Sequence, residues 1–298
     1  MKKKVIFPIA LLCLFIAAAA FKENPNKPFK LKKVFSNSFC YVPNGTVTID
    51  EVTAVVSAFY MSKTEVSNNE YTEFLQSVDD EDRAEAYAIK AQEWTEKMSS
   101  IPMAKYYHTH EAYQNYPVVN VTREAALAYC DWLTKKYASM DIGLPDDMKV
   151  VFSLPRRAEW VHAANGDLSG PYAWGGPNLR NARGQFLANF NRVGPENIHL
   201  NKETGEYEVI ALPGFMGTPG NMNENADILA PVASYAANGN GLLNMNGNAA
   251  EMLADSDQAS GGSWRSPGYD IRNESLMPFN EASPEVGFRP IAVFTKKK

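Results

Sequence analysis

Cysteine is scarce in this 298-residue chain, which contains Cys13, Cys40 and Cys130 and no others. Small secreted domains that depend on disulfides carry more cysteines than this, so a disulfide framework is excluded. A single bridge between Cys40 and Cys130 stays open, because sequence alone does not fix the distance between two thiols. No cysteine follows Cys130, which limits the soft-metal chemistry that the C-terminal half can support.

An excess of basic residues is also missing. The chain has 29 Lys and Arg against 34 Asp and Glu, a formal net charge of −5. An acidic protein is a poor partner for nucleic acid or for anionic lipid. We therefore expect no nucleic acid among its partners, and we look instead for a protein or glycan partner.

Long apolar runs are absent apart from residues 5–20, which follow three lysines and end in four alanines. This pattern is typical of a signal peptide over residues 1–20, with a retained membrane anchor as the alternative. A lipidated Cys13 is not expected, because Leu12 precedes it where a small residue is normal. We predict an exported protein, in the periplasm or at the outer membrane, that reaches a membrane only through this segment if it is uncleaved. Removing residues 1–20 would shift the net charge to about −8, since three lysines and no acids leave.

Residues 37–298 are predicted to form one domain behind a flexible, Lys- and Pro-rich leader at 21–36. Strands are expected within 39–49, with a turn at 43–45, and in the extended run at 55–67. Ser67 and Glu70 have the spacing of a capping box at the start of a helix. Thr122 is placed to cap a helix that runs to about Tyr137. Further helices are expected within 79–98 and over 157–164, with a loop over 99–116.

Gly, Asn and Pro dominate residues 166–248, where regular periodicity fades. Interleaved aromatic residues, 11% of the whole chain, argue against disorder. We therefore predict a compact domain built largely of ordered loops. Such loops require bound ions or dense side-chain hydrogen bonding to satisfy their backbone groups.

Eight short runs occur in an order that resembles the formylglycine-generating enzyme family, also called the sulfatase-modifying-factor domain. They extend from about residue 38 to 294 and read FYMSKTEVSNNEYTEFL, YPVVNVTREAALAYCDWL, FSLPRRAEWVHAANG, YAWGG, APVASY, NGLLNMNGNAAEM, SGGSW and EVGFRP. The resemblance implies an α+β fold, a loop-rich variant of the C-type lectin fold. The loop HEAYQNYPVVNV looks like that of the family's gliding-motility and type IX secretion lipoproteins of Bacteroidetes, of the GldK and GldJ kind.

The family's oxidase reaction implies a copper site made by two cysteines, at the second and seventh positions after the tryptophan of GGSW. Thiolates suit this role because they are soft ligands for Cu(I). Here those positions hold Ser266 and Ile271. We therefore expect neither copper nor formylglycine-generating activity.

The GGSW run itself favours a structural role, with glycines at close backbone approaches and Trp264 in the core. The alternative is a remnant groove that binds a peptide. The polar residues that could line such a cleft are Ser263, Arg265, Ser266, Tyr269 and Arg272. An ordinary hydrogen-bonded surface loop is the competing interpretation for them.

By resemblance, the segment 244–251 wraps a calcium ion, with ligands from the Asn244 side chain, the Gly247 and Ala249 carbonyls, and Glu251. All four positions keep the hard oxygen donors that calcium prefers. The competing interpretation is a loop whose asparagines cap turns. A second calcium site would use Asn189 and the Phe190 carbonyl, with Glu224 favoured by spacing and Asp227 by chemistry.

Two departures from the family pattern concern capping and cysteine pairing. Arg156 stands where a threonine normally caps the helix at 157–164. Pro290 stands where many members have a cysteine whose usual partner aligns with Cys130. Cys130 is therefore predicted to be a free buried thiol.

His108 and His110 offer a different metal hypothesis. Two residues apart in an extended segment, they would face the same side and could share a metal ion. Some relatives are non-haem iron enzymes, although their iron ligands come from a helical domain that this sequence lacks. Two surface histidines on a loop are the competing interpretation.

These observations favour a non-catalytic binding or scaffold module over an enzyme. The alternatives kept open are a metal-dependent enzyme of the non-haem iron type and a lectin-like carbohydrate binder. The sequence does not identify the partner, the oligomeric state or the residues that complete the second calcium site.

Overall fold

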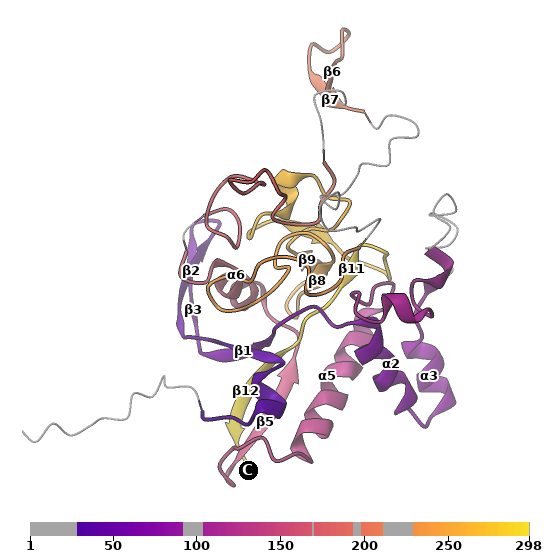
Figure 1. The fold of residues 1–298 in the computed structure, drawn as a ribbon, viewed down its shortest axis with the longest axis vertical. Helices are drawn as coiled ribbons and strands as arrows, with labels where there is room; N and C mark the ends of the chain where they lie inside the picture. Colours follow the sequence, from indigo (N-terminus) through magenta and orange to yellow (C-terminus); the bar gives the residue numbers. More distant parts are fainter. Residues whose placement is uncertain (1–28, 92–103, 169, 193–197, 211–228, 298) are drawn as a thin grey trace, which may run out of the picture.

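The computed structural model describes residues 29–91, 104–168, 170–192, 198–210 and 229–297. The described helices are α1 (Lys33–Ser36), α2 (Asn68–Gln76), α3 (Glu81–Tyr87), α5 (Arg123–Ala138) and α6 (Arg157–Asn165), with 3-10 turns η1 (Ala104–Tyr106), η2 (Glu111–Tyr113) and η5 (Gly268–Ile271). The strands are β1 (Phe39–Val42), β2 (Gly45–Ile49), β3 (Val52–Val56), β4 (Phe59–Ser62), β5 (Met148–Ser153), β6 (Ile198–Leu200), β7 (Tyr207–Val209), β8 (Ala250–Met252), β9 (Gln258–Ser260), β10 (Leu276–Pro278), β11 (Val286–Gly287) and β12 (Ile291–Lys296). This is the mixed, loop-rich α+β architecture that the sequence predicts (Figure 1).

Two four-stranded sheets form the centre of the fold. The first has the order β1-β4-β12-β5, and the second has the order β10-β9-β8-β11 with β8 and β11 parallel. The β2–β3 and β6–β7 pairs are separate antiparallel hairpins. Residues 43–44 of the expected turn lie between β1 and β2, and Gly45 already begins β2.

The first sheet is buried on both faces. In β4, Tyr60 points into one core cluster, whereas Phe59 and Met61 point into another, because successive strand residues face opposite sides. Helix α5 packs on β5, and α6 contacts β2 and β3. The two cores therefore share the sheet as their common wall.

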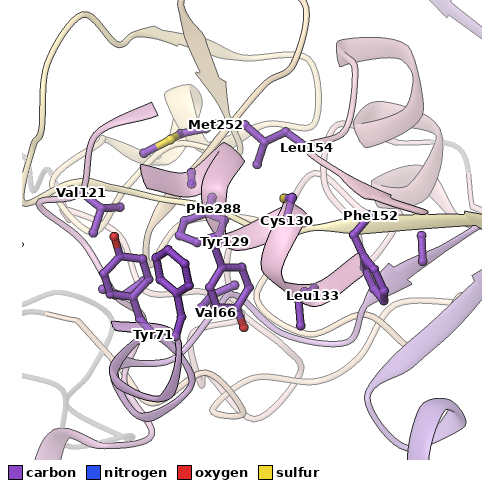
Figure 2. Close-up of a cluster of buried hydrophobic side chains, with 14 of the residues drawn as sticks. Val66, Tyr71, Val121, Tyr129, Cys130, Leu133, Phe152, Leu154, Met252 and Phe288 are labelled. Atoms are coloured by element: carbon purple, nitrogen blue, oxygen red, sulfur yellow. The ribbon is translucent and has the colours of Figure 1, made fainter. Parts of the chain in front are cut away.

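Helix α5 supplies much of the first core. Thr122 accepts a hydrogen bond from the Ala125 N–H at 3.1 Å, as predicted for its N-cap. Tyr129, Cys130 and Leu133 lie on its buried side, with Leu133 one helical turn after the other two, as on the inner face of an amphipathic helix. Figure 2 shows them against Tyr71 and Phe288.

The predicted flexible leader is wrong for its last residues. Residues 33–36 form α1, and Phe35 is completely buried, stacked against Phe39 at a 4.7 Å centroid distance and edge-on to Tyr60. Burial of a phenylalanine side chain contributes about 1.5–3 kcal/mol, which offsets part of the ordering cost of this short segment. The predicted signal peptide at 1–20 lies outside the described residues. Within the described part of the chain, no helix combines the length and apolar character needed to cross a bilayer.

Both described cysteines are free thiols. Cys130 is buried on α5 without a disulfide partner, as predicted, and burial raises the pKa of its thiol. Cys40 is half-buried, and its Sγ donates to the Gly241 carbonyl at 3.3 Å. The open question of a bridge between them is thereby answered, since neither is disulfide-bonded.

Candidate functional site

Asparagines in the segment 244–248 hold the loop-rich half of the molecule together. Asn246 donates from Nδ2 to the Ile271 carbonyl at 2.7 Å and accepts at Oδ1 from the Ala173 N–H at 2.8 Å. Asn248 accepts at Oδ1 from the Ala230 N–H at 2.7 Å and donates from Nδ2 to the same residue's carbonyl at 3.1 Å. These contacts are the dense side-chain hydrogen bonding that the irregular backbone requires.

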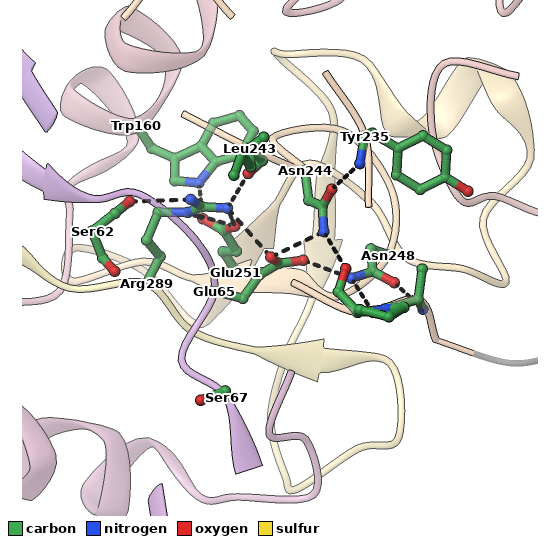
Figure 3. A network of polar contacts seen from close by, with 12 residues as sticks. Ser62, Glu65, Ser67, Trp160, Tyr235, Leu243, Asn244, Asn248, Glu251 and Arg289 are labelled. Atoms are coloured by element: carbon green, nitrogen blue, oxygen red, sulfur yellow. Dashed lines mark hydrogen bonds and ion pairs between the residues drawn. The ribbon is translucent and has the colours of Figure 1, made fainter. Parts of the chain in front are cut away.

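A buried ion cluster lies next to these asparagines, between the two sheets (Figure 3). Arg289 follows β11 and is completely buried. Its guanidinium donates to both oxygens of Glu251 at 2.7–3.0 Å, and to the backbone carbonyls of Ser62 and Leu243 at 3.1 and 2.8 Å. The indole N–H of Trp160 donates to Glu251 Oε2 at 2.7 Å. The cluster therefore joins β4, α6 and β8 at one point, which is how a buried charge becomes tolerable.

Glu65 adds a second buried carboxyl group to this cluster. Asn248 Nδ2 donates to its Oε1 at 2.8 Å, Asn244 Nδ2 to its Oε2 at 3.3 Å, and Arg289 Nη2 lies 3.8 Å away. Burial raises the pKa of Glu65 to about 8, since Arg289 offsets only part of that effect and Glu251 adds to it. Two buried acids thus share one guanidinium.

The side chains of the expected calcium site are turned toward protein donors. Both Glu251 oxygens accept from Arg289, and one also accepts from Trp160, while Asn244 Oδ1 accepts from the Tyr235 N–H at 3.3 Å. Figure 3 shows these two groups pointing to different partners. Arranged in this way, they do not fit a calcium cage, which needs its oxygens directed at one ion. Asn244 and Asn248 tie loops together here, as the competing interpretation expects, and calcium binding by the segment 244–251 stays a prediction.

The expected second calcium site lies beside the first. Asn189 accepts at its carbonyl from the Asn248 N–H at 2.7 Å and donates from Nδ2 to Asn248 Oδ1 at 3.1 Å. Gly247 is required there, because an added Cβ would lie 2.1 Å from the Asn189 carbonyl oxygen. Phe190 is buried against Phe186, and the two acidic residues predicted for this site, Glu224 and Asp227, lie outside the described residues.

The GGSW run, residues 261–264, is packed inside the fold rather than facing an open cleft. Gly262 has φ +65°, and a Cβ there would lie 2.5 Å from the Asp270 carbonyl oxygen. Trp264 is buried with Tyr107, Val119 and Leu229. Its indole N–H donates to the Pro284 carbonyl at 3.1 Å, so both its ring and its polar edge are used internally.

The polar residues predicted to line a cleft separate into two groups. Ser263 is completely buried, donates to Glu285 at 2.7 Å and is linked to Ser266, whose Oγ accepts from the Ser263 N–H at 2.9 Å. Arg265 pairs with the same Glu285 at 3.6 Å. These three residues close a turn, and the prediction that Ser263 faces a cleft is wrong because the fold covers it.

Tyr269 and Arg272 form the second group. The Tyr269 side chain is 67% exposed, and the Arg272 guanidinium lies 3.5 Å from its ring centroid. Tyr269 borders an open groove of about 680 Å³. The groove is lined on its other sides by Arg180, Phe186, Phe190 and Arg192, among others.

The two arginines of this groove were not predicted as site residues. A signal was present, because residues 168–195 contain Arg180, Arg183 and Arg192 and no acidic residue, in a chain whose net charge is −5. Neither residue belongs to a recognised motif. Their proximity to Tyr269 depends on the loop path, which no local pattern predicts.

Ile271 lies beneath this groove. It is completely buried among Tyr172, Phe186 and Phe190, so the position that carries a copper ligand in the oxidase is part of an apolar cluster here. Ser266 is half-buried, and its backbone N–H donates to the Ser263 carbonyl at 3.0 Å. Neither residue presents a soft ligand.

His108 and His110 do not form the shared site that an extended segment would give. They lie in a turn between η1 and η2. Nδ1 of His108 lies 3.1 Å from Asn68 Oδ1, and burial lowers the pKa of His108 to about 3. His110 accepts at Nδ1 from the Ala112 N–H and caps η2. Among the described residues, no group of three or more His, Cys, Asp or Glu side chains is placed to hold a metal ion.

A family model described as the sulfatase-modifying factor enzyme 1-like domain matches residues 29–293, so the chain belongs to this family. The formylglycine-generating enzyme of Thermomonospora curvata is 33% identical over 174 residues, which cover 58% of this chain and 42% of that protein. The enzyme of Bos taurus is 27% identical over 229 residues, covering 67% and 49% respectively. The chain therefore spans about half or less of the length of these curated relatives.

Solved structures agree with this assignment at the level of the fold. PvdO from Pseudomonas aeruginosa superposes with a TM-score of 0.56 at 16% identity, covering 89% of this chain and 98% of that one. Treponema denticola variable protein 1 gives a TM-score of 0.52 at 15% identity, covering 85% and 94%. The sulfatase-modifying-factor fold expected from the eight sequence runs is thus confirmed.

Proposed function

We propose that this protein is an exported, non-catalytic member of the family that acts as a binding or scaffold module in the cell envelope. One observation carries the proposal. The two positions at which the family's oxidase has thiolates hold Ser266 and Ile271, and Ile271 is sealed in an apolar cluster. Since no cysteine follows Cys130, the loop has no substitute thiol with which to hold Cu(I).

Without the copper-binding cysteines, the fold can still bind a partner through its surface. The groove exposes two arginines and the Tyr269 ring, and arginine and tyrosine are common in protein-binding surfaces. The cell-envelope location rests on the signal-like segment 1–20. The same proposal includes a role in a gliding or type IX secretion apparatus. This role is inferred from the resemblance of the loop at 110–121.

An oxidase assay tests the loss of catalysis. The protein would be loaded with Cu(I) and incubated in air with a cysteine-containing peptide, and the products would be analysed by mass spectrometry. The Thermomonospora curvata enzyme serves as the positive control. We expect conversion by the control and none by this protein; conversion by this protein that disappears after copper removal would overturn the proposal.

Site-specific photo-crosslinking tests the binding role. A photoreactive amino acid would replace Tyr269 in the full chain, produced in its native host, and Val52 on the β2–β3 hairpin would be replaced as the control. Both side chains are well exposed, at 67% and 69%. We expect a discrete adduct from position 269 and none from position 52. Equal labelling at both positions would contradict a dedicated binding face.

A further inference from the structure

The β6–β7 hairpin has one apolar face and one polar face. Ile198 pairs with Val209 and Leu200 pairs with Tyr207, and because directly opposed residues share a face, these four side chains lie together. His199 and Glu208 pair on the other face. The turn is closed by the Asn201 backbone, which donates to Glu206 at 2.8 Å and accepts from Gly205 at 2.8 Å.

This apolar face is open to solvent. The exposed fractions are 48% for Ile198, 50% for Leu200, 76% for Tyr207 and 64% for Val209. Figure 1 shows the hairpin standing apart from both sheets. A two-stranded hairpin is marginally stable by itself in water, and it gains stability when an apolar face is covered. A contiguous exposed apolar face of this kind marks an interaction site.

The hairpin is continuous with the arginine groove, because Val209 lines the groove together with Tyr269, Arg180 and Arg192. The Arg180 guanidinium lies 3.5 Å from the Phe186 ring centroid, which holds its charge at the groove wall. Arg192 is exposed and makes no ion pair with any residue of the described segments. The surface therefore combines an apolar face with positive charge on an otherwise acidic protein.

We propose that the hairpin and the groove together bind an extended segment of another exported protein, one that carries both acidic and apolar side chains. Its carboxylates would pair with Arg180 and Arg192, and its apolar side chains would cover Tyr269 and the hairpin face. The proposal rests on the binding role inferred above and specifies the partner's chemistry. Charge complementarity selects an acidic segment, since none of the residues that line the groove is acidic.

A second copy of this chain fits the surface less well. A stable interface buries roughly 800 Å² per partner, so a homodimer would use the groove as well as the four hairpin side chains. The groove would also have to receive an equally basic groove from the other copy, because two-fold interfaces use the same patch on both subunits. Like charges would then be opposed, at a cost in affinity.

Fluorescence anisotropy with defined peptides tests the proposal. The probe is a labelled decapeptide that alternates Glu and Leu, compared with matched peptides that alternate Lys and Leu or Glu and Ser. The full-length protein would be compared with Arg180→Gln/Arg192→Gln and with Tyr207→Ser/Val209→Thr. The matched controls are Arg83→Gln on α3 and Val52→Thr/Val55→Thr on the β2–β3 hairpin, whose valines are also exposed.

We expect the Glu–Leu peptide to bind and both comparison peptides to bind weakly. Each test pair should weaken binding about tenfold, as the loss of roughly 1.4 kcal/mol would produce, while the controls leave it unchanged. Added salt should weaken the binding of wild type but not that of the arginine variant, because screening acts on charge pairs. Unchanged thermal unfolding of the variants would confirm that they remain folded.

Three results would overturn the proposal: equal affinity for the Lys–Leu peptide, no effect of either test pair, or a dimer in sedimentation that Tyr207→Ser/Val209→Thr disperses. Binding to lipid vesicles that needs the hairpin but not the arginines would overturn it as well. The oxidase assay separates this inference from the proposed function. Peptide binding together with copper-dependent catalysis would contradict the non-catalytic role but would still support the proposed docking surface.

Discussion

Burial favours the protonated form of the Glu65 carboxyl group. Its pKa rises to about 8 in the folded protein, from an ordinary value of 4.5. The unfolded chain therefore loses this proton first as pH rises, and the stability that the protonated group contributes is lost between about pH 4.5 and pH 8. At full ionisation the loss is on the order of 5 kcal/mol, because one pKa unit corresponds to about 1.4 kcal/mol.

Glu65→Gln tests this assignment, because glutamine imitates the protonated acid. The variant and the wild type should have similar unfolding free energies near pH 4.5. The variant should become the more stable of the two as pH rises to 8, since it has no proton to lose. Urea unfolding at several pH values measures the difference; parallel pH profiles would show that Glu65 is ionised in the folded state across this range.

Arg289 neutralises the buried Glu251 carboxylate, so its removal should be severe. Arg289→Met leaves Glu251 without its cation, and we expect a loss of about 3–5 kcal/mol in unfolding free energy. Arg289→Lys keeps the charge but has fewer donors, so its loss should be smaller. Adding Glu251→Gln to Arg289→Met should recover part of the loss in urea unfolding, because it removes the stranded charge. A double variant less stable than Arg289→Met would contradict this account of the cluster.

For individual residues, the sequence predicted which positions are important more accurately than it predicted which side chains they contact. Asn244 and Glu251 were expected as calcium ligands, and the structure uses them in hydrogen bonds and an ion pair. Arg289 and Glu65 were not predicted as their partners, because they lie far away in sequence. Only the fold brings residues 65, 251 and 289 together, and no local pattern encodes that contact.

Among the elements, α2 depends on its capping box. Ser67 Oγ accepts from the Glu70 N–H at 3.3 Å, and Glu70 Oε2 accepts from the Ser67 N–H at 2.8 Å. Ser67→Ala should lower the unfolding free energy by about 1 kcal/mol. Because Glu70 Oε2 also accepts from the Ser67 hydroxyl at 2.7 Å, Glu70→Ala and the double variant should show coupling. Strictly additive losses in urea unfolding would rule out a cooperative box.

Elements with local signals were predicted from the sequence, and elements that depend on remote contacts were not. The capping residues of α2 and α5 are correct because their partners lie three residues away. Helix α1 was missed because the rings that cover Phe35 include Tyr60 and Tyr137. The cap lost at Arg156 is replaced by Asp255, whose carboxylate accepts from the Arg157 N–H at 3.1 Å across the fold.

For the molecule as a whole, the asparagine and ion cluster should keep the loops ordered when divalent cations are removed. We expect the melting temperature in excess EDTA to stay within about 2 °C of that in calcium, with magnesium as the matched ion. Calcium bound at one hundred times its Kd would add about 2.7 kcal/mol, which corresponds to a shift of several degrees. A shift of that size, specific for calcium, would restore the calcium site that the resemblance implies.

The whole fold was predictable from eight ordered runs, whereas the groove and the projecting hairpin were not. The runs preserve the residues that pack the core, such as Trp160 and Trp264, and a shared core brings a shared fold with it. The proposed binding surface instead draws on residues 178–192 and 198–209, which fall between the runs YAWGG and APVASY, and on Tyr269. Neither stretch belongs to a family run, so the resemblance does not indicate where its side chains lie.

Strand β12 lies between β4 and β5, so its position determines the order in which the protein can assemble. It pairs residue 291 with residue 61 on one side and with residue 153 on the other. Until residues 291–296 arrive, β4 and β5 are left with unpaired edges, which are sites of aggregation. Contacts between such distant positions also make folding slow. Until β12 is in place, the first sheet therefore has open edges that can pair with other chains.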